Sequence, residues 1–286
     1  MSSNKIAVAV IHGMGSQGKD RQGTNDISFS AGLYTRLKEY LGDDFFDHVA
    51  WREVFWADIL QTRQEEYIKY LGDKGGRWMD ARRFVMHNLG DAASYRKTED
   101  SRDQTYFRIH ERVHQTIQRL EQLTDGNTPL IVLAHSLGGH IMSNYIYDMM
   151  KGTPQIDGSS DFQKLKTMAT FVTFGCNIPV FSFSYKPENV HPIRYPGTNI
   201  AADRRMSPWW YNYNDKDDAL GMPLAGLSPA YGALADSGGL RDGWVSNGGF
   251  FQFWNPASHS QYWTSRNFYR PVGSVLKKAM KIGPVA

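Results

Sequence analysis

A short apolar run, a glycine-rich turn and a helical pattern follow one another directly between residues 129 and 150. The run reads Pro129-Leu-Ile-Val-Leu-Ala134, the turn reads His135-Ser-Leu-Gly-Gly139, and apolar residues then recur at helical spacing. A short run without polar side chains that ends at a turn is typical of a strand buried on both faces of a parallel sheet. We therefore predict a strand, a tight turn and a helix here.

The same alternation of strand and helix continues along the rest of the chain. Residues 5–11 are rich in β-branched side chains and end at a His-Gly turn, which predicts a second buried strand. Further strands are predicted at 49–56, 167–174 and 209–213, and helices at 26–41, 103–123, 141–150 and 272–280. Alternating strands and helices predict an α/β fold with a mostly parallel central sheet flanked by helices.

The 286 residues are interpreted as one domain with inserted segments. Residues 57–100 are polar, with many arginine, glutamate and aromatic residues, and they predict a helical cap over the core. Residues 219–258 mix glycine, proline and serine with aromatic residues. We expect this second segment to form a long lid or pocket loop, because long loops in compact domains are usually functional.

Composition and charge exclude several classes of protein. Cys176 is the only cysteine, so the chain can form no internal disulfide and no multi-cysteine zinc site, and Cys176 itself is expected in the core. The 32 basic and 29 acidic residues are interspersed, which argues against a nucleic-acid-binding protein. No apolar run approaches the roughly 18 residues of a membrane-spanning helix. No secretory signal is recognised either, so we expect a soluble, cytoplasmic protein.

Ser136, in the turn after the predicted strand, is the candidate nucleophile. A sharp turn between strand and helix lifts a serine Oγ above the sheet, and the small residues Ala134 and Gly138 permit the strained backbone. The helix that follows directs its N–H groups toward the same place, and we expect the Leu137 N–H to stabilise an oxyanion. The alternative is a serine that only caps the helix, which does not explain the paired glycines after a buried strand.

The sequence Ala134-His-Ser-Leu-Gly138, in this setting, resembles the G-H-S-L-G nucleophile turn of α/β-hydrolases. Within that fold the chain is similar to bacterial lipase-like serine esterases, with Ala134 in place of the first glycine. The resemblance covers nearly the whole chain in the order of its elements. It implies an α/β-hydrolase fold and a serine carboxylic-ester hydrolase that requires no cofactor.

The turn His12-Gly13-Met14-Gly15 directly follows the first predicted strand. It resembles the H-G turn that supplies the other oxyanion donor in this fold, which implies a role for the N–H of Gly13 or Met14. The pattern Gly13-x-Gly15-x-x-Gly18 also matches a dinucleotide-binding fingerprint. That interpretation needs a helix at the third glycine and an acidic residue about 20 positions on, at the end of a strand, and neither is predicted.

The resemblance also implies that a carboxylate and then a histidine follow the serine in chain order. His259 is the only histidine after Asp218, and it is the expected general base. Asp215, Asp217 and Asp218 all follow the strand predicted at 209–213, and the segment from Asp218 to Leu224 resembles the acid loop of related hydrolases. Asp218 is the expected acid, with Asp217 as the next choice. A calcium loop is the competing interpretation, but the twelve-residue ligand spacing is missing, so no metal is predicted.

The predicted function is therefore hydrolysis of a small-molecule ester with a short to medium acyl chain. Ser136, His259 and Asp218 would act as nucleophile, base and acid, through an acyl-enzyme. Two alternatives stay open: a lipase or phospholipase that contacts aggregated lipid transiently, and a catalytically silent hydrolase fold that only binds. The sequence does not distinguish esters from thioesters or amides, and it does not determine the oligomeric state.

Overall fold

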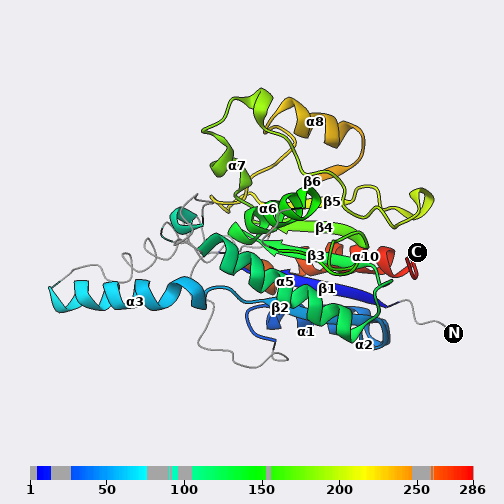
Figure 1. Cartoon of the computed structure of the whole chain (residues 1–286), viewed down its shortest axis with the longest axis horizontal. Helices are drawn as coiled ribbons and strands as arrows, with labels where there is room; N and C mark the ends of the chain where they lie inside the picture. Colours follow the sequence, from blue (N-terminus) through cyan, green and yellow to red (C-terminus); the bar gives the residue numbers. More distant parts are fainter. Residues whose placement is uncertain are drawn as a thin grey trace.

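A computed structural model describes residues 5–13, 27–75, 90, 92–95, 105–152, 156–246, 259 and 261–285. These residues build an α/β fold around a six-stranded sheet, in the order β2-β1-β3-β4-β5-β6, in which every pair of neighbouring strands is parallel (Figure 1). The strands are β1 (Ile6–Ile11), β2 (Val49–Val54), β3 (Leu130–His135), β4 (Met168–Phe174), β5 (Trp210–Asp215) and β6 (Leu240–Val245). The α/β prediction with a parallel sheet is thus confirmed.

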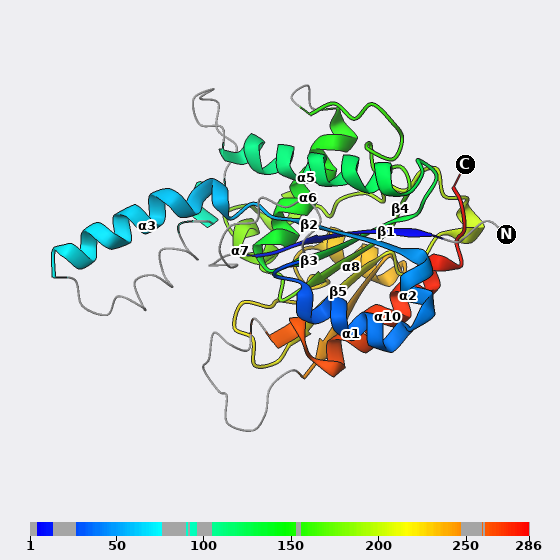
Figure 2. The same ribbon diagram turned by 90° about the horizontal axis from the view of Figure 1, so that it is seen from below.

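Helices cover both faces of the sheet, as expected for parallel strands. Figure 2 shows α5 (Thr105–Leu123) and α6 (Leu137–Lys151) on one side, and α1 (Ala31–Leu41) and α10 (Arg266–Met280) on the other. Further helices are α2 (Asp43–His48), α3 (Asp58–Asp73), α7 (Ile178–Ser182) and α8 (Pro229–Asp236), and short 3₁₀ turns lie at Pro187–Asn189, Ala202–Arg204 and Gln261–Trp263.

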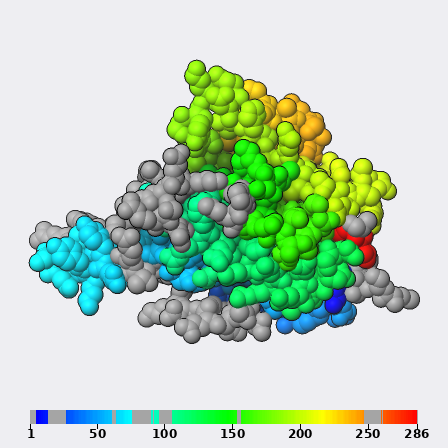
Figure 3. Space-filling model, in the orientation of Figure 1, coloured from blue at the N-terminus to red at the C-terminus, as the bar shows by residue number. Residues whose placement is uncertain are grey.

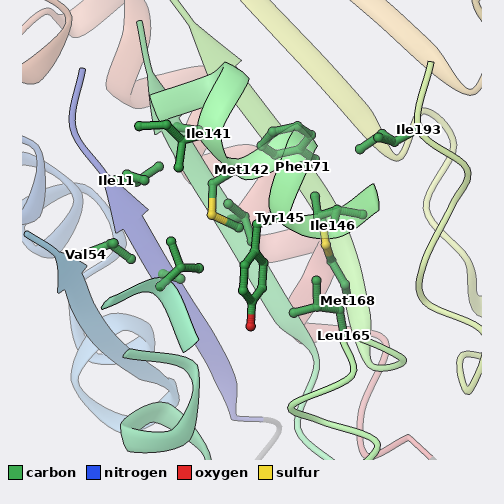
Figure 4. Packing of buried hydrophobic residues seen from close by; sticks show 14 of the residues in the cluster. Ile11, Val54, Ile141, Met142, Tyr145, Ile146, Leu165, Met168, Phe171 and Ile193 are labelled. Carbon is green, nitrogen blue, oxygen red and sulfur yellow. The ribbon is translucent and has the colours of Figure 1, made fainter. Parts of the chain in front are cut away.

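The core is divided by the sheet into two apolar clusters. Alternate residues of β1 point to opposite faces, so Ile11 belongs to the cluster under α5 and α6, and Val10 to the cluster under α1 and α10. Figure 4 shows part of the first cluster, where Ile141 and Tyr145 of α6 lie over the sheet. Because β1, β3 and β4 are buried along their whole length, their sequences are mostly apolar, and in β4 only Thr170 and Thr173 interrupt the apolar run.

The side of the sheet to which successive strands are added changes at β1. The chain passes from β1 to β2 on one side, and later strands add on the other side, beginning with β3. In open parallel sheets the crevice at the carboxyl ends of the strands, next to such a reversal, is where ligands bind. The turns after β1 and β3, which contain Gly13 and Ser136, meet at this point.

One of the two segments expected as insertions has more regular structure than predicted. In the segment 219–258, residues 229–236 form α8 and residues 240–245 form β6, so a continuous loop was the wrong prediction for that part. In the segment 57–100, α3 is one long helix that extends away from the sheet (Figure 1), and its atoms project from one side of the molecule (Figure 3). Residues 76–89, 91, 96–100 and 247–258 lie outside the described residues, so the cap and lid roles stay predictions.

Candidate active site

Ser136 lies between the last residue of β3 and the first residue of α6. Its φ is +54°, a conformation that only one other non-glycine residue in the described part of the chain shares, and its N–H donates to the Phe174 carbonyl oxygen of β4 at 3.0 Å. A non-glycine residue in this region costs about 1–3 kcal/mol and persists only where its surroundings hold it. The local backbone is therefore the strained turn expected from the sequence.

Two glycines allow the turns after β1 and β3 to pack together. A Cβ on Gly138 would lie 2.5 Å from the His12 carbonyl oxygen, and one on Gly13 would lie 2.3 Å from Cβ and 2.9 Å from Oγ of Ser136. Neither position has room for a methyl group. The backbone at Gly13 is therefore in direct contact with the Ser136 side chain.

His259 and Asp218 are joined by their side chains. His259 Nδ1 lies 3.0 Å from Oδ1 and 2.9 Å from Oδ2 of Asp218. The carboxylate can only accept, so Nδ1 carries the proton, which leaves Nε2 of the neutral ring as a proton acceptor. The Asp218 side chain is 1% exposed and the His259 side chain 15% exposed, so the carboxylate is sealed behind the imidazole.

Two further donors hold the Asp218 carboxylate. The Leu220 N–H donates to Oδ1 at 3.0 Å, and the Tyr262 hydroxyl donates to Oδ2 at 3.0 Å. Burial raises the pKa of Asp218, but the hydrogen bonds from His259, Leu220 and Tyr262 and the charge of His259 outweigh it, so this pKa lies below its ordinary value. Asp218 is therefore ionised and suited to stabilise an imidazolium.

Tyr262 is a site residue that the sequence analysis did not identify. Its hydroxyl accepts from the Asp215 N–H at 2.7 Å while it donates to Asp218, so it connects both ends of the acid turn. Burial, and then the neighbouring Asp218 charge, raise the pKa of Tyr262 far above its ordinary value, which keeps the hydroxyl a donor. A tyrosine three residues after a histidine has no distinctive pattern that could have revealed this role.

The other two carboxylates of the acid turn lie elsewhere. Asp215 is buried and accepts from the Asp217 N–H at 2.9 Å, whereas Asp217 is exposed. Of the three, Asp218 is the carboxylate that the fold brings to His259. Within the described ranges, no three histidine, cysteine or acidic side chains converge as metal ligands would.

The geometry does not join Ser136 to His259. Ser136 is fully buried, and among the described residues its Oγ has no hydrogen-bond partner. The His259 ring instead lies next to the ring of His135, the residue before the serine, with 4.6 Å between the ring centroids. Hydrogen bonds of a catalytic site are often long or absent without substrate and shorten in the substrate complex.

Two of the three expected oxyanion donors lie beside the serine. Leu137 is the first residue of α6, and the first N–H groups of a helix have no acceptor within that helix. Gly13 touches the Ser136 side chain, as described above. Met14, the third candidate, lies outside the described residues.

His12 anchors the turn that contains Gly13. Its ring is stacked on Trp56 with 4.9 Å between centroids, its Nδ1 donates to the Gly13 carbonyl oxygen at 2.8 Å, and its Nε2 accepts from the Trp56 N–H at 3.2 Å. Burial lowers the pKa of His12 to about 3, although the hydrogen bond to Gly13 opposes this shift. A permanently neutral His12 fits a structural anchor and not a general base.

Cys176 is fully buried, as predicted, and burial raises the pKa of its thiol to about 12.

No helix in the described ranges has both the length and the apolar character to cross a bilayer. Comparison of the sequence with known protein families and with curated proteins found no match.

Proposed function

We propose that the protein is a serine hydrolase of the α/β-hydrolase type that cleaves carboxylic esters through an acyl-enzyme. One observation supports this most strongly: a serine with positive φ follows β3 at the reversal of strand order, at the edge of the sheet where the Asp218–His259 pair also lies. The order of the groups is also that of the fold, since the serine follows β3, the acid follows β5, and the base lies between β6 and α10.

In this proposal Ser136 Oγ attacks the ester carbonyl carbon while His259 Nε2 accepts its proton. The positive charge on His259 is stabilised by Asp218, and the new oxyanion receives N–H groups from Leu137 and from Gly13 or Met14. The bond between the carbonyl carbon and the alcohol oxygen then breaks while His259 gives its proton to that oxygen, which leaves the acyl-enzyme and the free alcohol. A water molecule attacks the acyl-enzyme with His259 again as base, which releases the acid and restores the serine.

The mechanism requires Ser136 Oγ and His259 Nε2 to form a hydrogen bond when substrate binds. Two features favour this contact: Asp218 already orients the imidazole, and the end of β3 holds the serine backbone. The proposal involves no cofactor, and every step uses groups of this chain and water.

Substitution of the nucleophile tests the proposal. We expect wild-type protein to be labelled by a fluorophosphonate and to hydrolyse chromogenic esters, and Ser136→Ala to lose both, with a decrease in kcat on the order of 10⁶. Ser143→Ala is the matched control, since Ser143 lies on the same helix and donates to the His140 carbonyl oxygen. Equal labelling of wild type and Ser136→Ala would refute the assignment.

Exposed apolar side chains favour the lipase as a second candidate. Val180, Phe183 and Tyr185, in and after α7, are 47%, 71% and 64% exposed. They follow β4, and therefore lie toward the same edge of the sheet as Ser136. Aggregated lipid would be bound by such side chains, and ester turnover that rises sharply above the solubility limit of the substrate would favour this candidate.

A folded protein whose serine is never acylated would instead favour the silent binding module. A cytoplasmic location stays a prediction from the sequence.

A further inference from the structure

His135 is a buried histidine that the proposed mechanism does not use. It is the last residue of β3, directly before Ser136, and it is 3% exposed. Its ring is enclosed by aromatic rings, with centroid distances of 4.6 Å to His259, 5.0 Å to Phe174 and 5.3 Å to Trp263. The ring is thus tightly packed among aromatic side chains.

One short hydrogen bond connects His135 to the expected base. His135 Nε2 lies 2.7 Å from the backbone carbonyl oxygen of His259, 124 positions further along the chain. A carbonyl oxygen only accepts, so the proton of His135 resides on Nε2. Nδ1 has no hydrogen-bond partner among the described residues, as expected for the unprotonated nitrogen of a neutral ring.

The surroundings keep His135 neutral. Burial lowers its pKa well below the ordinary value, and the neighbouring His259 and His12 lower it further, while the hydrogen bond to His259 and the charge of Asp218 only partly oppose this. The proton on Nε2, and with it the hydrogen bond, therefore remains in place over the range in which an ordinary histidine titrates.

His259 is consequently held at two points of different kinds. Its imidazole is oriented by Asp218, and its main-chain carbonyl is hydrogen-bonded to His135, the last residue of β3, directly before Ser136. Without the second bond, Asp218 would fix the direction of the ring but not the distance of the residue from the serine. A displacement of about 1 Å between reacting groups can reduce the rate on the order of 100-fold.

We propose that His135 is a positioning residue, which sets the distance between the nucleophile and the base through its Nε2–H bond to the His259 carbonyl oxygen. The inference rests on the proposed function, since it assigns a role within the same site. His135 itself takes no part in proton transfer.

Two amide substitutions test this role because they differ only in reach. The amide nitrogen of His135→Gln lies close to the place of Nε2 and can still donate to the His259 carbonyl, whereas that of His135→Asn lies close to the place of Nδ1 and cannot. His135→Phe retains the ring and removes the donor. We would measure fluorophosphonate labelling rates, kcat and KM on a soluble ester, and thermal midpoints, for the full chain in each case.

We expect the Gln variant to label within a few-fold of wild type. The Asn and Phe variants should fold and bind ester with an unchanged KM, but label and turn over on the order of 10- to 100-fold more slowly. Equal rates in all four proteins would overturn the proposal, and so would Asn and Phe variants that fail to fold, since His135 would then be a packing residue. If wild type itself is not labelled at Ser136, the proposed function fails instead.

Discussion

Gly13 and Gly138 are the residues at which the site leaves least freedom of substitution. Each removes a side chain where two turns cross, and the contact at Gly13 is with the serine itself. Glycine is not needed at these two positions for its conformational freedom, since neither residue has a positive φ. What matters is the absence of a Cβ, which lets the end of β1 approach the end of β3.

We expect Gly13→Ala to lower the free energy of unfolding by about 1–3 kcal/mol, because the new methyl group overlaps Ser136 and must displace it. The rate at which fluorophosphonate labels Ser136 should also fall in this variant. Gly226→Ala is the control, since a Cβ there meets no atom within 4 Å, and it should change stability by less than about 0.5 kcal/mol. Urea unfolding measures both, and unchanged stability in Gly13→Ala would contradict the observed packing.

Asp218 should make stability depend on pH in the acidic range. Its folded-state pKa lies below the ordinary value of about 3.9, so its ionised form stabilises the fold above about pH 4, and this contribution is lost as pH falls through the folded-state pKa. We expect the thermal midpoint of wild type to fall more steeply below pH 4 than that of Asp218→Asn. Asp217→Asn, at the exposed neighbouring position, should follow wild type, and parallel curves for all three would disagree with the hydrogen bonds seen at Asp218.

Asp218→Asn should also reduce ester turnover, although Ser136 is still present. An amide at position 218 cannot stabilise the imidazolium, and the expected decrease in kcat is on the order of 10⁴.

At the scale of the elements, β6 supports the acid loop. Asp242 on this strand accepts from the N–H groups of Leu224 and Ala225 and from the Asn212 side chain of β5, at 2.6–3.0 Å. Asn212 in turn donates to the Met222 carbonyl oxygen at 3.0 Å. The chain after Asp218 is thus hydrogen-bonded to the neighbouring strands β5 and β6.

Asp242→Ala should leave these N–H groups without an acceptor and destabilise the fold by about 1–3 kcal/mol, as measured by urea unfolding. Arg241→Ala is a suitable comparison because Arg241 is exposed on the same strand. A loss in Asp242→Ala no larger than in Arg241→Ala would mean that β6 does not support the loop.

β6 is also the strand that sequence analysis missed, and its composition explains why. Its residues, Leu-Arg-Asp-Gly-Trp-Val, include two charged residues and a glycine, because the strand lies at the edge of the sheet and only its first and last residues are buried. The predicted strands β1, β3 and β4 are buried throughout, so their apolar runs were sufficient. α10 likewise begins at Arg266, before the expected 272, where a proline interrupts the helical pattern.

Across the whole molecule, exposed apolar side chains near α7 lie toward the edge of the sheet that carries the site. If the protein acts on aggregated lipid, Phe183→Ser should lower turnover several-fold above the solubility limit of an ester and leave turnover of the dissolved ester unchanged. Tyr147→Ser is the control, because Tyr147 is 48% exposed on α6 and lies about three helical turns beyond Ser136. The lipase would be contradicted if Phe183→Ser and Tyr147→Ser changed turnover equally, both above the solubility limit of the ester and with dissolved ester.

The sequence by itself determined the features that depend on neighbours along the chain: the buried strands, the strained turn at Ser136, and the α/β class that follows from their alternation. Only the tertiary structure decided which of the three aspartates between positions 215 and 218 meets His259, that Tyr262 and His135 hydrogen-bond to that pair, and that a polar edge strand supports the acid loop. These contacts join residues 17 to 124 positions apart. They depend on the order of the strands in the sheet and on the packing of the helices, and local patterns of residues predict neither.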